Sequence, residues 1–224
     1  MYFQIKPDFK NIQITHLKAT NREEPFLTNK YMTSTFKKKE IPSMYELAIY
    51  GGAFNPPHAG HAQVMIEASR HARSVWVVPS FRHPHGKRMA EYERRLGWLQ
   101  AIVEQVRPAC ASAISVSRIE QQLARLTDAP IYSYGLLCTL ADITRLPTRQ
   151  IALVVGHDVA AQLPDFHLGT QLLERFSVLC VDEQVGVRST LLRERLALGE
   201  TLPAHWMAPG MNPVDYGLYA AHRN

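Results

Sequence analysis

The sequence has no apolar run close to the ~18–20 residues that a membrane-spanning helix needs. Its first ten residues, MYFQIKPDFK, lack the apolar core of a signal peptide. Cysteine is scarce: Cys110, Cys138 and Cys180 are widely spaced, odd in number and without CxxC spacing. We therefore expect buried thiols in a reducing compartment, a cytoplasmic location, no membrane association and no cysteine metal site or disulfide framework.

A clustered excess of positive charge is missing from most of the chain. The net charge is +5, but residues 1–43 carry eight Lys/Arg against four Asp/Glu, and residues 44–224 carry seventeen against sixteen. A groove that follows a phosphate backbone needs a clustered basic face. No nucleic-acid partner is therefore expected for the nearly neutral body of the chain.

The composition changes at Met44. Residues 1–43 hold seven of the eight lysines, include the run Lys37–Glu40 and show no sustained apolar period. We expect a basic, poorly ordered leader, outside the native product if translation begins at Met44; the alternative is a polybasic arm that contacts RNA, lipid head groups or a partner. Residues 44–224 are expected to form one domain.

From Met44 onward, strand and helix signals alternate. Short β-rich runs occupy 46–50, 75–78, 113–116, 151–155 and 176–181, and helical spacing occupies 61–72, 91–106, 136–145 and 190–198. The alternation predicts an α/β fold, a Rossmann-like doubly wound parallel sheet with helices on both faces. Such sheets bind ligands beyond the carboxyl ends of their strands, here where the turns after strands one and four meet.

The segment GGAFNPPHAGH, residues 51–61, directly follows the first predicted strand. Gly51 and Gly52 permit a tight turn whose amide groups can hold phosphate oxygens. His58 and His61 lie three residues apart at a predicted helix start, so both imidazoles can face one anion. The alternatives are two surface histidines or a metal pair, for which no accompanying Glu or Cys is present.

This segment matches the (H/T)xGH signature of the nucleotidyltransferase superfamily. From about residue 46 to 219 the chain resembles nicotinate- or nicotinamide-mononucleotide adenylyltransferases, which bind ATP with Mg²⁺ and join AMP to a pyridine mononucleotide, releasing pyrophosphate. The resemblance implies that Gly51 and Gly52 help to bind ATP. It also implies catalytic contacts from His58 and His61 to the ATP phosphates. The amide groups of Ala53 and Phe54 are implied to lie near the α-phosphate.

Two further segments extend the resemblance. Residues 187–193, VRSTLLR, resemble the family's ISSTxxR motif; this implies that Ser189 and Thr190 bind ATP and that Arg193 acts on its phosphates, while Arg188 stands where the family commonly has Ser. Residues 155–167 resemble the family's GxD stretch, which implies adenosine contacts from Gly156 and Asp158.

The substrate-binding residues come from three places. Phe166 falls where the family's Trp stacks on the pyridine ring, with core packing as the alternative. Lys87 and Arg95 resemble family charges that hold the mononucleotide phosphate or the pyridine carboxylate. The alternative is a mobile loop whose charges are only solvated. Ser133 and Tyr134 resemble the start of the family's SYTxDTL helix, but the following residues depart from it, so the choice between acid and amide substrate stays open.

The resemblance implies attack by the mononucleotide 5′-phosphate on the α-phosphorus of ATP, with no protein nucleophile or base and no side chain assigned as a metal ligand. Another superfamily transferase acting on phosphopantetheine or an alcohol phosphate, and a non-catalytic nucleotide sensor, are the alternatives. A fragment of an aminoacyl-tRNA synthetase is not supported, because no KMSKS-like run is present. Whether the chain forms a homo-oligomer stays open.

Overall fold

The computed structural model describes residues 44–82, 86, 88–182 and 184–220, so the predicted leader and Lys87 lie outside the described residues. Five strands form one sheet in the order β3-β2-β1-β4-β5, and every neighbouring pair is parallel. The strands are β1 (Leu47–Gly52), β2 (Ser74–Pro79), β3 (Ala113–Val116), β4 (Ile151–Gly156) and β5 (Ser177–Val181). Each overlaps a predicted strand.

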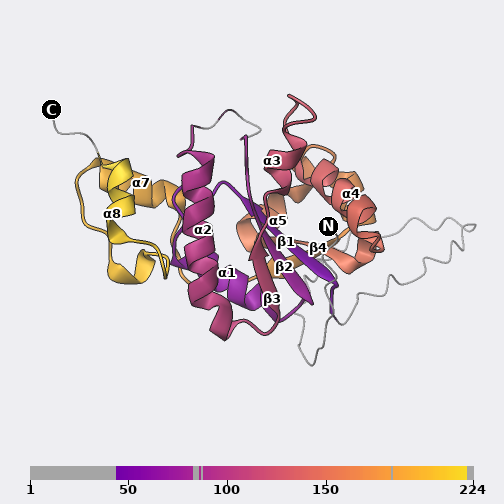
Figure 1. Ribbon diagram of the computed structural model, residues 1–224, viewed down its shortest axis with the longest axis horizontal. Coiled ribbons are helices and arrows are strands. Elements are labelled where there is room, and N and C mark those ends of the chain that lie inside the picture. Colours follow the sequence, from indigo (N-terminus) through magenta and orange to yellow (C-terminus); the bar gives the residue numbers. More distant parts are fainter. Residues whose placement is uncertain (1–43, 83–85, 87, 183, 221–224) are drawn as a thin grey trace, which may run out of the picture.

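Helices cover both faces of this sheet, which confirms the doubly wound prediction (Figure 1). The longer ones are α1 (Ala59–Ser69), α2 (Tyr92–Val106), α4 (Ser133–Thr144) and α7 (Ser189–Ala197), and each overlaps a predicted helix. Four shorter ones were not predicted: α3 (Ile119–Leu123), α5 (His157–Gln162), α6 (Gly169–Arg175) and α8 (Pro213–Tyr216). Within the described ranges, no helix combines the length and the apolar character needed to cross a membrane.

The strands alternate their side chains between two cores, because successive residues of a strand point to opposite faces. Ala48 of β1 belongs to the core under α1, α2 and α7, whereas its neighbours Leu47 and Ile49 belong to the core under α4 and α6. Residues of β2, β4 and β5 divide in the same way. Both faces of the sheet are therefore buried, as expected of a parallel sheet.

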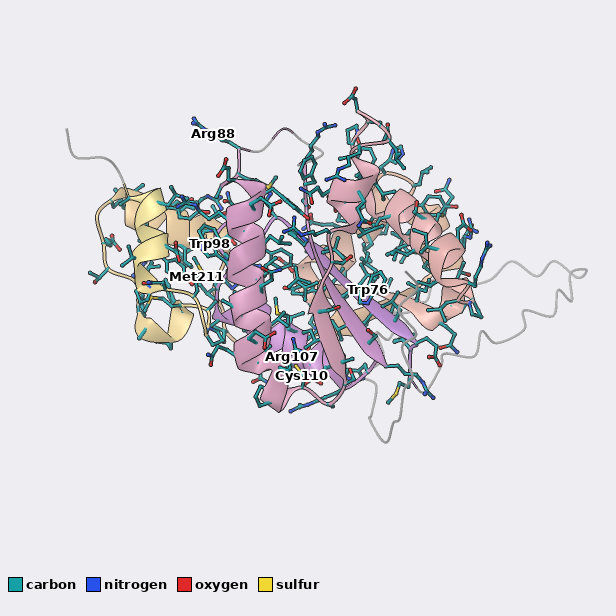
Figure 2. All side chains as sticks on the ribbon, in the orientation of Figure 1. Trp76, Arg88, Trp98, Arg107, Cys110 and Met211 are labelled. Atoms are coloured by element: carbon teal, nitrogen blue, oxygen red, sulfur yellow. The ribbon has the colours of Figure 1, made fainter. Side chains whose placement is uncertain are left out.

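The C-terminal segment, residues 208–219, packs on α2. Trp98 of α2 and Met211 of that segment belong to the same core, and both are almost fully buried (Figure 2). Gly210 has a φ of 78°, and a Cβ there would lie 2.5 Å from the backbone oxygen of Ala101. Only glycine fits this close approach. Tyr216 and Tyr219 of the same segment reach the loop that follows β1.

The three cysteines are free thiols, as expected. Each is half-buried, however, and none is fully buried as the sequence suggested. Burial raises the pKa of the Cys110 and Cys180 thiols, so both favour the protonated form.

Candidate active site

A cavity opens at the carboxyl ends of β1 and β4, which are neighbours in the sheet. This is the place predicted from the strand order. Three segments far apart in the sequence line it: the end of β1 with the loop that follows, the end of β4, and the start of α7. The lining residues are Tyr50, Gly51, Gly52, Phe54, His58, His61, Val154, Val155, Gly156, Asp158, Val159, Arg188, Ser189 and Thr190.

The turn after β1 is made at Phe54 and not at the glycines. Gly51 and Gly52 are the last two residues of the strand, whereas Phe54 has a φ of 47°. A left-handed backbone is strained in a residue with a side chain. The buried Phe54 ring offsets this strain by packing edge-on against Tyr50 and His61, at centroid distances of 5.4 and 5.0 Å.

His58 and His61 form a stacked pair at the start of α1. Their ring centroids are 3.6 Å apart and the rings are inclined by 28°. The backbone N–H of His58 donates to Nδ1 of His61 at 3.0 Å. Because Nδ1 of His61 accepts this bond, a neutral His61 carries its proton on Nε2. Gly60 permits the stack, since a Cβ there would lie only 3.1 Å from Nδ1 of His58.

Burial keeps both imidazoles neutral at pH 7. Desolvation, with a smaller contribution from the nearby Arg188 charge, lowers the pKa of His58 to about 4. Desolvation, followed by the charges of His58 and Arg188, lowers the pKa of His61 well below its usual value. The pair can therefore donate N–H hydrogen bonds to an anion without adding positive charge to the cavity.

Asn55 organises the loop after β1, a role that was not predicted. Its side-chain oxygen accepts from the backbone N–H of Ala90 at 2.9 Å and from the hydroxyl of Tyr219 at 2.5 Å. The residue is buried, so these bonds join the loop to two distant segments. The only sequence signal was its place inside the GGAFNPPHAGH segment.

The start of α7 and the C-terminal segment hold the same loop through its carbonyl groups. Ser189 Oγ donates to the Pro56 oxygen at 2.9 Å, and the Tyr216 hydroxyl donates to the Pro57 oxygen at 3.1 Å. Ser189 and Thr190 line the cavity, and their contact with ATP stays a prediction. These bonds fix the loop by two of its carbonyl groups.

Arg193 joins the loop after β1 to the start of α7, and its predicted contact with the ATP phosphates stays a prediction. Its Nη1 donates to the backbone oxygen of Asn55 at 2.6 Å and its Nη2 to Oγ1 of Thr190 at 3.1 Å. It is not among the residues that line the cavity. The guanidinium therefore supports the loop after β1 through the Asn55 carbonyl and touches Thr190, a residue that lines the cavity.

The opposite wall carries Gly156 and Asp158, both at the predicted cavity. Asp158 Oδ1 accepts from the backbone N–H of Val159 at 2.8 Å, which fixes the carboxylate. Its Oδ2 lies 3.2 Å from Nη2 of Arg188. Ala53, in contrast, does not line the cavity, and its carbonyl accepts a bond from Arg95.

Arg95 does not hold a charge open to substrate, and this corrects the prediction. It is 1% exposed, and its three donor nitrogens bind the backbone oxygens of Ala90, Ala53 and Ser80 at 2.8–2.9 Å. It therefore braces the loops after β1 and β2. The sequence showed an arginine at a family-like spacing but could not show which acceptors it meets.

Glu120 lies beside this brace. Its Oε2 accepts from the backbone N–H of Phe81 at 2.9 Å, and the side chain is buried. Burial raises the pKa of Glu120 to about 7, against smaller opposing effects of that hydrogen bond and of Arg95. The loop after β2 is thus held by a buried carboxyl group that titrates near neutral pH.

The predicted pyridine residues lie outside the cavity described above. Ser133 and Tyr134 begin α4, and Tyr134 and Phe166 pack, partly exposed, against the core under α4. Packing against the core was the alternative for Phe166. Beside it, the rings of Tyr132 and His167 lie 4.3 Å apart. No group of three or more His, Cys, Asp or Glu suited to a metal ion occurs among the residues that the structure describes.

Comparison with known proteins gives consistent matches. Residues 49–195 match the family model described as cytidylyltransferase-like. A relative from Myxococcus xanthus (strain DK1622), named for nicotinate-nucleotide adenylyltransferase activity, is 30% identical over 200 residues, covering 80% of this chain and 96% of its own. A similarly named relative from Anaeromyxobacter dehalogenans (strain 2CP-C) is 30% identical over 168 residues, covering 69% of this chain and 86% of its own.

Solved structures give the same fold. A Vibrio parahaemolyticus structure, named for nicotinate-nucleotide adenylyltransferase, is 27% identical with a TM-score of 0.60, covering 79% of this chain and 99% of its own. A Plasmodium falciparum nicotinic acid mononucleotide adenylyltransferase solved with NaAD has a TM-score of 0.62 at 18% identity, covering 77% and 96%.

Proposed function

The chain belongs to the nicotinate-nucleotide adenylyltransferase family within the cytidylyltransferase-like group, and from that premise we propose that it transfers AMP from ATP to nicotinate mononucleotide. The products are the dinucleotide and pyrophosphate, a step of NAD biosynthesis. The observation that carries the proposal is the stacked His58–His61 pair, which lines the cavity at the carboxyl ends of β1 and β4.

The reaction requires little covalent chemistry from the protein. A 5′-phosphate oxygen of the mononucleotide attacks the α-phosphorus, and the bond to the bridging oxygen breaks, leaving its electron pair on pyrophosphate. The attacking oxygen is already anionic, so no base is required. The protein must align two polyanions and stabilise charge on the leaving group. Nε2 of His61 is a fixed donor suited to that charge.

Magnesium enters with ATP as part of the substrate. Mg²⁺ in phosphate-transfer sites keeps several waters and is held by phosphate oxygens with one or two carboxylates. The cavity is lined by one described carboxylate, Asp158, which fits a metal delivered on the nucleotide better than a resident ion. No side chain is assigned to the metal.

Substrate preference follows the names of the relatives, which specify the nicotinate form. We assign the acid substrate on that ground. The free thiols suit a reducing compartment such as the cytoplasm.

The test is pyrophosphate release from MgATP with nicotinate or nicotinamide mononucleotide at matched concentrations. We expect faster release with the nicotinate form. Faster release with the amide would contradict the substrate assignment while leaving the transfer reaction intact. Absence of release with both would contradict the transfer reaction itself.

A further inference from the structure

Two buried side chains of opposite charge type hold one peptide group of the loop after β2. Arg95 Nη2 donates to the Ser80 oxygen at 2.8 Å, and Glu120 Oε2 accepts from the Phe81 N–H at 2.9 Å. The oxygen of Ser80 and the N–H of Phe81 belong to the same planar peptide group. Arg95 is 1% exposed and Glu120 is 5% exposed. A guanidinium and a carboxyl group, both inside the protein, therefore fix this peptide from its two sides.

Arg95 connects this peptide to a second one, at the cavity. Its Nη1 donates to the Ala53 oxygen at 2.9 Å, and that oxygen shares a peptide group with the N–H of Phe54. The Ser80 N–H also donates to the oxygen of Gly52 at 2.9 Å. Gly52 and Phe54 both line the cavity. Arg95 thus joins the wall of the cavity at the end of β1 to the carboxyl group on α3.

The second peptide precedes the strained turn of the loop after β1. Phe54 has a φ of 47°, and such a left-handed backbone persists at a residue with a side chain only where the surrounding structure holds it. The bond from Arg95 to the Ala53 oxygen fixes the peptide plane on the N-terminal side of this turn. Loosening that bond would let the turn relax, and the wall of the cavity at Gly52 and Phe54 would shift with it.

We propose that Glu120 is a positioning residue for the transfer reaction: with Arg95 it fixes the turn at Phe54, and this hold is tighter when Glu120 is ionised than when it is protonated. The proposal rests on the proposed function and deepens it. An ionised carboxylate accepts a stronger bond from the Phe81 N–H than a protonated carboxyl group does. It also balances the charge of the buried Arg95 guanidinium, whereas protonation leaves that charge less compensated.

Glu120 is the group beside this peptide that changes charge around neutral pH. Burial raises the pKa of Glu120 to about 7, against smaller effects of its hydrogen bond from the loop after β2 and of the Arg95 charge. Tyr92, which also faces it from α2, has its pKa raised to about 12 by burial and stays neutral. Arg95 stays charged, as guanidinium groups do in proteins. Arg118 and Glu93, which act on Tyr92, are exposed and form an ion pair.

The pH profile of kcat tests the proposal. It is measured in the pyrophosphate-release assay from about pH 6 to about pH 8.5, for the native chain, Glu120→Gln, Glu120→Asp and the control Glu104→Gln. Glu104 is an exposed carboxylate paired with Arg107 at the C-terminal end of α2, whereas Arg95 lies in the first turn of that helix (Figure 2). Glu104→Gln removes the same unit of charge as Glu120→Gln, away from the two held peptides.

We expect the ratio of the native kcat to the Glu120→Gln kcat to rise about fivefold between about pH 6 and about pH 8.5, the scale by which a charge-assisted hydrogen bond exceeds a neutral one. Glu104→Gln should follow the native chain. Glu120→Asp should show a smaller rise, because its carboxylate lies one methylene further from the Phe81 N–H. Titration of the substrate phosphates is common to all four proteins and cancels in the ratio. His58 and His61 are already neutral over this range, since burial lowers their pKa values.

The direction of the change separates positioning from stability. Ionisation of the buried Glu120 carboxyl group lowers the free energy of unfolding, so a purely structural role predicts that the kcat ratio stays level or falls as the pH rises. Positioning predicts that the ratio rises. A ratio that stays constant or falls with pH would therefore overturn the proposal while leaving the transfer reaction intact.

Amide hydrogen exchange in the substrate-free chain tests the hold without catalysis. In Glu120→Gln the Phe81 amide should exchange at least ~5-fold faster than in the native chain at about pH 8, whereas Glu104→Gln should match the native chain. Equal exchange at Phe81 in the native chain and in Glu120→Gln would overturn the hold. If the native chain releases no pyrophosphate with either mononucleotide, the transfer reaction fails, and faster exchange in Glu120→Gln still establishes the hold on the loop after β2.

Discussion

Replacing Arg95 tests the internal support of the site. Its guanidinium is 1% exposed and donates to three backbone carbonyls, those of Ala53, Ser80 and Ala90. Arg95→Met keeps much of the side-chain volume and removes all three donors. Each buried acceptor left unsatisfied costs at least ~1 kcal/mol, so the free energy of unfolding should fall by about 3 kcal/mol or more.

Urea unfolding, followed by tryptophan fluorescence and circular dichroism, measures this change. Arg94→Met is the matched control, because Arg94 is the exposed neighbour on the same helix. We expect Arg94→Met to stay within about 0.5 kcal/mol of the native chain. Arg95→Lys keeps the charge but lacks the planar fork, so it should recover only part of the lost stability.

The same variants separate a brace from a substrate contact. A brace predicts a large loss of stability, with turnover falling because both supported loops shift. A substrate contact predicts normal stability and a raised KM for the mononucleotide. If Arg95→Met is as stable as Arg94→Met and only the KM for the mononucleotide changes, then Arg95 contacts substrate and does not brace the loops.

Four further predictions follow from the site. His61→Ala should lower kcat at least ~10²-fold in the pyrophosphate assay, the scale of one fixed donor; near-normal turnover contradicts its role. Gly60→Ala should lower kcat while retaining the fold, because its Cβ would lie 3.1 Å from Nδ1 of His58; an unchanged kcat refutes the need for the stack. The folded-state pKa of His58 is about 4, below its usual value, so the stability that neutral His58 contributes is present above about pH 6.5 and is lost as the pH falls toward 4. In denaturant titrations, the free energy of unfolding of the native chain should fall over this range by about 3 kcal/mol more than that of His58→Asn. Glu120 has the opposite effect on the pH dependence of stability, because its pKa is raised to about 7. The free energy of unfolding should fall by on the order of 3 kcal/mol as the pH rises from about 4.5 through 7, and Glu120→Gln should abolish this decrease. A pH profile of stability unchanged by either substitution contradicts the corresponding cause.

Much of the fold was predictable because the strands are apolar and the main helices are long. The run around Ile49 and the one around Val154 are buried on both faces, which leaves an apolar signal in the sequence. Helices α3, α5 and α6 were missed because five to seven residues are too few to show a clear helical period.

The candidate site was predictable where its chemistry is local. His58 and His61 are three residues apart at a helix start, which predicts that they lie on one side; the structure pairs them at the cap, where the extended His58 donates its backbone N–H to Nδ1 of His61. The supports were not predictable, because Tyr216 and Tyr219 reach the loop after β1 from more than 150 residues away. Residue type shows that a guanidinium is present, whereas only the fold shows that Arg95 meets carbonyls and Arg188 meets the cavity.

The most direct test of the central claim follows the α-phosphorus of ATP. The chain is incubated with Mg²⁺, nicotinate mononucleotide and ATP labelled with ³²P at the α position, and the products are separated by chromatography. Our account predicts that the label appears in the dinucleotide, with unlabelled pyrophosphate formed in equal amount, and that His61→Ala suppresses both. Label that remains in ATP, or appears in AMP without a dinucleotide, would contradict transfer of AMP to the mononucleotide.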